Sequence, residues 1–116
     1  MSAAVVYLKR DFLLANLNTV QALVNAFYLT LQWMQKASPE QITDNVPQEY
    51  WLGDKALYLA ALKADLQVYS LDGVVSAASR ARAEFLRQLD KEIAAARIDP
   101  AKTWEGQFVE AAAKRN

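Results

Sequence analysis

The sequence predicts an all-α fold of about five helices, and three observations support this prediction. Apolar residues recur at helical spacing in several segments of the 116 residues. Capping residues followed by proline or glutamine indicate helix starts. Only Ala3 to Leu8 has the composition of a strand, and that strand would have nothing in the chain to pair with. With 53% apolar and 22% charged residues, we expect residues 1–116 to form a single helical domain.

The most apolar helix is expected over residues 19–37, with Asn18 or Thr19 as its cap. It carries apolar residues round most of its circumference, which predicts cover on more than one side. A short helix is expected before it, at Asp11 to Ala15. After it, Ser38 and Gln41 have the spacing of a capping box, and Pro47 limits that next helix to residues 39–46.

Three further segments complete the predicted fold. Asp54 is expected to cap a helix over residues 54–69, and Asp72-Gly73 is the clearest turn in the chain. Ser76 or Ser79 is expected to cap a long helix over residues 76–98. After Asp99-Pro100, a last helix is predicted from Thr103 to residue 114.

The composition excludes several kinds of site. The chain has no Cys and no His, which removes the usual zinc sites, Ser-His-Asp triads and Cys-His pairs. Its 13 basic and 13 acidic residues cancel, so no overall field favours nucleic acid or an anionic membrane. The apolar run Ala3 to Leu8 is too short for a signal-peptide core or a membrane span. We therefore expect no enzyme activity, no catalytic, metal or cofactor-binding residue, no cofactor, no nucleic-acid partner and no direct membrane insertion.

Three groups of residues have both a functional and a structural interpretation. A basic cluster on the helix over 76–98 resembles a phosphate-binding stripe. However, acidic residues are interleaved with it, and Arg80 is spaced to pair with Glu84 and Arg87 with Asp90. This pattern favours a solvated helix face. Asp65 stands in an apolar helix, yet nothing in the sequence provides a partner for acid–base chemistry, so an exposed or paired carboxylate is favoured. A set of aromatic residues is more typical of a core or a partner-binding patch than of a ligand platform. These are Trp33, Tyr50, Trp51, Tyr58 and Tyr69.

An ordered series of short segments resembles the C-terminal part of ABC-transporter solute-binding proteins of the nitrate, sulfonate and taurine type. The segments are Asn18-Thr19-Val20-Gln21-Ala22-Leu23-Val24-Asn25-Ala26, Leu31-Gln32-Trp33-Met34-Gln35-Lys36, Ser38-Pro39-Glu40-Gln41-Ile42, Pro47-Gln48-Glu49-Tyr50-Trp51, Gly53-Asp54-Lys55-Ala56-Leu57-Tyr58, Leu71-Asp72-Gly73, Ile98-Asp99-Pro100-Ala101-Lys102-Thr103-Trp104 and Phe108-Val109-Glu110. The resemblance covers about Phe12 to Lys114. One departure is residues 74–89, where the family has a looser stretch and this sequence predicts continuous helix.

The resemblance implies the helical end of a two-lobed periplasmic binding protein that delivers a small solute to a membrane permease. Both α/β lobes and their ligand contacts would precede Met1, so no binding residue is transferred, and solute binding is expected only if those lobes are supplied. It implies a periplasmic location, whereas the chain as written, without a signal peptide, would stay in the cytoplasm. The related thiamine-pyrimidine synthases offer an enzyme alternative, but they depend on histidine and a metal.

The resemblance also predicts self-association, because a missing lobe would leave the helix over 19–37 partly uncovered. The expected surface is apolar and consists of Phe12, Val20, Val24, Phe27 and Leu31. A patch of this kind exceeds what soluble monomers usually expose, and pairing about a two-fold axis would cover it. We therefore expect a homodimer. The alternative function is a helical self-association or protein-interaction module without a role in transport.

Overall fold

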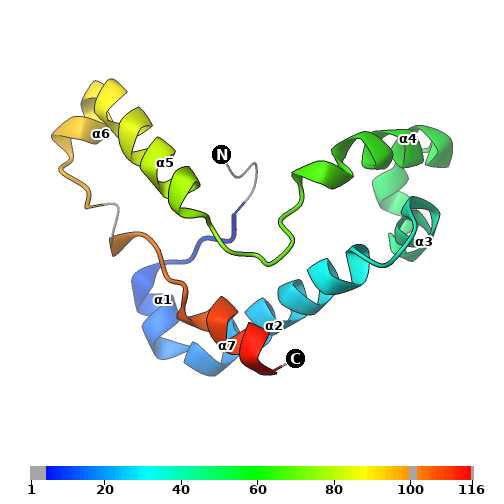
Figure 1. Cartoon of the computed structure of the whole chain (residues 1–116), viewed down its shortest axis with the longest axis horizontal. Coiled ribbons are helices and arrows are strands. Elements are labelled where there is room, and N and C mark those ends of the chain that lie inside the picture. Colours follow the sequence, from blue (N-terminus) through cyan, green and yellow to red (C-terminus); the bar gives the residue numbers. More distant parts are fainter. Residues whose placement is uncertain (1–4, 100–101, 116) are drawn as a thin grey trace.

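The structure, a computed structural model, describes residues 5–99 and 102–115. Within these ranges every regular element is a helix, which confirms the all-α prediction (Figure 1). The predicted number was too low, because the described residues form seven α-helices and two short 3-10 helices. In chain order they are α1 (Arg10–Ala15), α2 (Leu17–Met34), α3 (Pro39–Asn45), η1 (Gln48–Trp51), α4 (Lys55–Asp65), η2 (Leu66–Val68), α5 (Ala77–Leu89), α6 (Lys91–Ala95) and α7 (Gln107–Arg115).

Several helix starts lie where their capping residues predict. The hydroxyl of Ser38 accepts a hydrogen bond from the Gln41 amide at 3.2 Å, and the Gln41 side chain accepts one from the Ser38 amide at 2.8 Å, which completes the capping box. The Asp54 carboxylate caps α4 by accepting from the Leu57 amide at 2.9 Å. Before Pro47, Val46 is extended with a ψ of 130°, so α3 ends where the proline predicts.

The predicted helix over 76–98 is wrong as a single element. Ser76 caps its first part, α5, as one of the two predicted caps. The chain then leaves helical geometry at Asp90, whose carboxylate accepts from the amides of Glu92 and Ile93, both at 3.0 Å. Because aspartate is a strong N-cap, it ends α5 and starts α6 within a sequence whose apolar spacing continues without a break.

Other boundaries also differ from the prediction. The short helix near residues 11–15 is present as α1, and α2 begins at Leu17 without a side-chain cap from Asn18 or Thr19. The α-helix after Asp54 ends at Asp65 and is followed by η2, and the last helix begins at Gln107 instead of Thr103. Residues 5–8 are neither helix nor strand, while Ala3, Ala4, Pro100 and Ala101 lie outside the described residues.

The helices are arranged as a base with two diverging arms (Figure 1). The base consists of α1, α2 and α7, with α7 lying on α2. We call residues 38–70, with α3 and α4, the α3–α4 arm, and residues 76–98, with α5 and α6, the α5–α6 arm. The radius of gyration is 17.0 Å, whereas a compact domain of this length has about 13 Å. The molecule is therefore more open than a typical globular domain.

Two small cores hold the described residues together. In the base, Val20 of α2 is buried with Phe108, Val109 and Ala112 of α7. In the α3–α4 arm the buried residues are Ile42, Thr43 and Leu62, and the Thr43 hydroxyl donates to the Pro39 carbonyl at 2.9 Å. Neither α5 nor α6 contains a buried residue.

Candidate functional site

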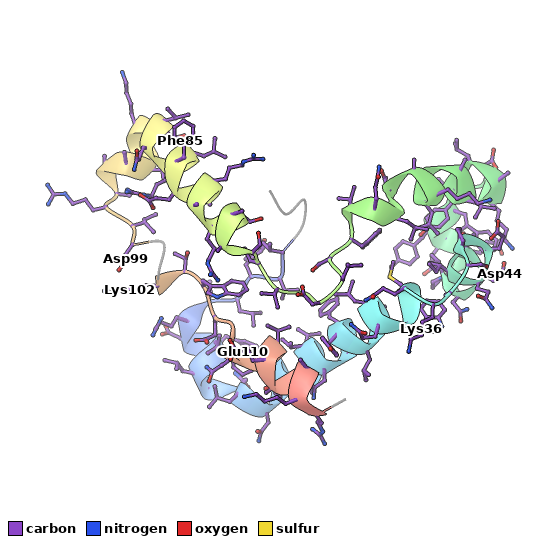
Figure 2. All side chains as sticks on the ribbon, in the orientation of Figure 1. Lys36, Asp44, Phe85, Asp99, Lys102 and Glu110 are labelled. Atoms are coloured by element: carbon purple, nitrogen blue, oxygen red, sulfur yellow. The ribbon has the colours of Figure 1, made fainter. Side chains whose placement is uncertain are left out.

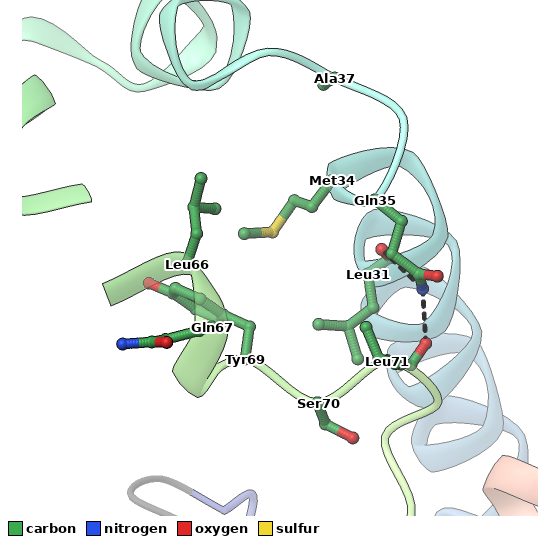
Figure 3. Close-up of a pocket in the computed structure, with 9 residues that line it drawn as sticks. All are labelled: Leu31, Met34, Gln35, Ala37, Leu66, Gln67, Tyr69, Ser70 and Leu71. Atoms are coloured by element: carbon green, nitrogen blue, oxygen red, sulfur yellow. Dashed lines mark hydrogen bonds between the residues drawn. The ribbon is translucent and has the colours of Figure 1, made fainter. Parts of the chain in front are cut away.

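An open pocket lies between the end of α2 and the segment after α4, and Figure 3 shows its lining side chains. It is open to solvent and has a volume of about 500 Å³. Its walls are mainly apolar, with amide and hydroxyl groups at the edge. The lining residues are Leu31, Met34, Gln35, Ala37, Leu66, Gln67, Tyr69, Ser70 and Leu71. Because none of them is charged, the pocket offers no counter-charge to an anionic solute.

Two glutamines of α2 position the chain at one edge of this pocket. The side-chain amides of Gln32 and Gln35 both donate to the Leu71 carbonyl, at 3.0 and 2.7 Å, and Figure 3 shows the bond from Gln35. The predicted turn follows directly and is confirmed: Gly73 has a φ of +72°, and the Asp72 carboxylate accepts from the Val74 amide at 2.9 Å. The loop after η2 is therefore fastened to α2, and the α5–α6 arm leaves from this point.

The predicted self-association surface is only partly exposed. Val20 is 3% exposed, because α7 packs over this part of α2, so Val20 cannot contribute to a surface. Val24 and Leu31 are half-buried, whereas Phe12 and Phe27 are 47% and 48% exposed. The sequence did not indicate that α7 would supply this cover from within the chain.

The α5–α6 arm exposes an apolar surface. Its large apolar side chains are all more than 40% exposed. They are Phe85, Leu86, Leu89, Ile93 and Ile98. Helical spacing alone does not reveal whether an apolar stripe packs inside the chain or faces outward. This surface is the main feature that the sequence analysis missed.

Arg80 and Arg87 of α5 are engaged locally, although with different partners from those predicted. Arg87 pairs with Glu84 instead of Asp90, with a shortest distance of 2.7 Å between Arg87 Nη2 and Glu84 Oε1. Their hydrogen bonds raise the pKa of Arg87 and lower the pKa of Glu84. Arg80 lies over the ring of Trp104, 5.7 Å from its centre, instead of pairing with Glu84. These contacts agree with a solvated helix face more than with a phosphate-binding stripe.

The remaining candidates do not come together as one site. Asp65 is exposed at the end of α4, and Lys63 pairs with Glu40 instead. Tyr69 is the only one of the five aromatic candidates that lines the pocket. Trp51 is half-buried beneath Lys55, whose ammonium lies 4.9 Å from the centre of the ring.

The described residues contain no cluster of three or more carboxylates that could hold a metal ion, and no helix among them has the length and apolarity needed to cross a membrane. A comparison with protein families, curated proteins and solved structures finds no match to this chain. The resemblance to solute-binding proteins therefore stays a prediction.

Proposed function

We propose that this chain is the helical C-terminal part of an ABC-importer solute-binding protein of the nitrate, sulfonate and taurine type. In this role it forms a scaffold and docking surface and does not capture solute on its own, and its location is periplasmic. The sequence support is the ordered series of short matches between Phe12 and Lys114. The observation that carries the proposal is the open fold, whose apolar side chains need cover from other protein.

That observation has two parts. The radius of gyration exceeds that of a compact domain of this length, and the α5–α6 arm contains no buried residue. In addition, the pocket beside Leu71 lacks charged lining groups. A solute site normally encloses its ligand with convergent polar groups, and this pocket does not.

The gene that encodes the chain tests the proposal. We expect an in-frame sequence upstream of Met1 that encodes two α/β lobes and a signal peptide. Co-expression of those lobes with this chain should then yield a stable complex with reduced exposure of Phe85 and Leu89. A stop codon and a separate start site immediately upstream would contradict the proposal.

A second function, a helical self-association module, is favoured by the exposed rings of Phe12 and Phe27. At 47% and 48% exposure, these rings keep apolar area in water, and its burial against another surface would favour association. Light scattering at micromolar concentration should then give a homodimer, and Phe27→Asp should weaken it. A monomeric parent chain, or a dimer unchanged by Phe27→Asp, would contradict this second function.

A further inference from the structure

We propose that two copies of this chain exchange arms, so that the α5–α6 arm of each copy docks on the α3–α4 arm of the other. This inference rests on the self-association proposed above and specifies the surfaces that carry it. It assigns the contact to the arms, whereas the sequence pointed to α2.

The first argument is that, within the described residues, the two arms make no main contact with each other. The main helix–helix contacts of the described residues join α1 and α7 to α2, α3 to α4, and α5 to α6, and none joins one arm to the other. The α3–α4 arm exposes apolar side chains as the α5–α6 arm does. They are Leu57 at 67%, Val68 at 57%, Tyr69 at 49% and Leu71, just beyond the arm, at 67%. Figure 2 shows side chains projecting from both arms as they diverge from the base.

The second argument is charge complementarity between the arms. The α5–α6 arm carries five basic and three acidic residues, whereas the α3–α4 arm carries five acidic and two basic residues. The two arms therefore attract each other. Some of this charge is also unpaired, because neither Arg82 nor Asp65 makes an ion pair with any described residue. These groups remain free to steer and orient a partner arm.

The third argument is area. A standard interface buries on the order of 800 Å² per partner. Both arms expose several large apolar side chains. A docking that uses both arms of both copies therefore buries more apolar surface than one that uses a single arm.

The fourth argument is closure. If the α5–α6 arm of one copy binds the α3–α4 arm of a second copy, the same contact is available in reverse about a two-fold axis. All four arms are then covered, and no open chain of copies results. Phe27 lies on the same stripe of α2 as Leu31, one turn away, and Leu31 lies beside the turn at Gly73 from which the α5–α6 arm departs. A partner between the arms would therefore lie near Phe27. Phe27→Asp is then expected to weaken this dimer as well.

Two charge-reversal variants and their mixture test the arm exchange. The first variant is Arg82→Glu with Lys91→Glu, which makes the α5–α6 arm acidic. The second is Glu49→Lys with Asp65→Lys, which makes the α3–α4 arm basic. Each variant alone should be at least about tenfold weaker in dimerisation, because like charges then face each other. Mixing them should restore a heterodimer, since the acidic arm of one variant meets the basic arm of the other on both sides.

The matched control is Lys9→Glu with Lys114→Glu, which changes the net charge as the first variant does but lies outside both arms. It should leave the dimer unchanged. Circular dichroism of each variant establishes that the helices are retained, and sedimentation velocity measures the dimer at micromolar concentration.

The outcomes separate this inference from the function on which it rests. A monomeric parent chain would overturn both self-association and arm exchange, and would leave the arms to be covered by another protein. A dimer that both variants leave intact would overturn arm exchange alone. Two weakened variants that form no heterodimer on mixing would also overturn arm exchange. That result would mean that the two arms of one chain bind each other, a contact that a second chain cannot restore.

Discussion

Leu52 is held in a backbone conformation that leucine rarely adopts. It has a φ of 52° and a ψ of 32°, and Gly53 follows with a φ of 84°. The two residues form a tight turn closed by a hydrogen bond from the Asp54 amide to the Trp51 carbonyl at 3.0 Å. The Leu52 side chain is 93% exposed, so no burial offsets the strain of the left-handed conformation.

Leu52→Asn should therefore stabilise the protein. Asparagine tolerates the left-handed region better than leucine, and we expect a gain of about 0.5–1 kcal/mol in the free energy of unfolding, measured by urea denaturation. The control is Leu57→Asn, because Leu57 is also exposed but lies within α4. There the change should lower stability by about 0.5 kcal/mol through helix propensity. Equal effects at the two positions would contradict the argument.

The α3–α4 arm should lose stability in acid partly through a single carboxyl group. Lys63 hydrogen bonds to Glu40, with a distance of 2.7 Å between Lys63 Nζ and Glu40 Oε1, and this bond lowers the pKa of Glu40 in the folded state. A lowered folded pKa means that the unfolded chain binds the proton more readily. The Glu40–Lys63 contact therefore stabilises the folded state fully above the ordinary carboxyl pKa. This stabilisation is lost as the pH falls through the lowered pKa of Glu40.

Glu40→Gln should accordingly flatten the dependence of stability on pH below about pH 4.3. Thermal unfolding followed between neutral and acidic pH measures this dependence. Glu49→Gln is the control, because Glu49 is exposed and makes no ion pair among the described residues. The prediction fails if Glu40→Gln and the parent lose stability in parallel as the pH falls.

At the scale of elements, the contact between α2 and α7 holds the base together. Phe108 is 7% exposed, and its carbonyl accepts a hydrogen bond from the Gln21 side chain at 2.9 Å. Phe108→Ala should lower the free energy of unfolding by about 3 kcal/mol, because it leaves a cavity in a core of few residues. Leu14→Ala, at a side chain that is 59% exposed, should cost much less. Comparable losses in urea denaturation would show that the base is not held by this core.

The sequence predicted the elements best where a capping residue and its partner are close in the chain. The capping box at Ser38, the Asp54 cap and the Asp72-Gly73 turn all depend on contacts within a few residues, and all are present. It failed where two local signals compete, as at Asp90, where apolar spacing continues through a strong N-cap. The position of α7 on α2 could not be predicted, because it depends on contacts between residues some 90 positions apart, such as Gln21 and Phe108.

The candidate surface was predicted less well for the same reason. Apolar residues recur at helical spacing in both α2 and α5, yet the structure buries Val20 and leaves Phe85 59% exposed. Which stripe is covered depends on where distant helices lie in space. The distribution of basic and acidic residues between the arms can be read from the sequence, but it becomes informative only once the arms are known to diverge.

For the whole molecule, we expect no solute capture by this chain alone. Nitrate, taurine, alkanesulfonates and pyrimidines should show no binding of micromolar or tighter affinity in isothermal titration calorimetry. The physical reason is that the open pocket beside Leu71 has no charged group and does not surround a ligand. Micromolar binding of any of these solutes would contradict the prediction, and its loss in Gln35→Ala would place the site in this pocket.

The three tryptophans of the chain stand in three different parts of the molecule. Trp33 is 41% exposed near the end of α2, Trp51 lies half-buried under Lys55 in the α3–α4 arm, and Trp104 lies between Arg80 and the backbone of Gly106 where the α5–α6 arm meets the base. Indole fluorescence depends on polarity and on nearby charges. Variants that keep one tryptophan and carry phenylalanine at the other two positions would therefore each report on one part of the molecule. Trp33 would report on the base, Trp51 on the α3–α4 arm and Trp104 on the junction of the α5–α6 arm with the base. The chain carries its own set of optical probes for following the order in which these three parts unfold or meet a partner.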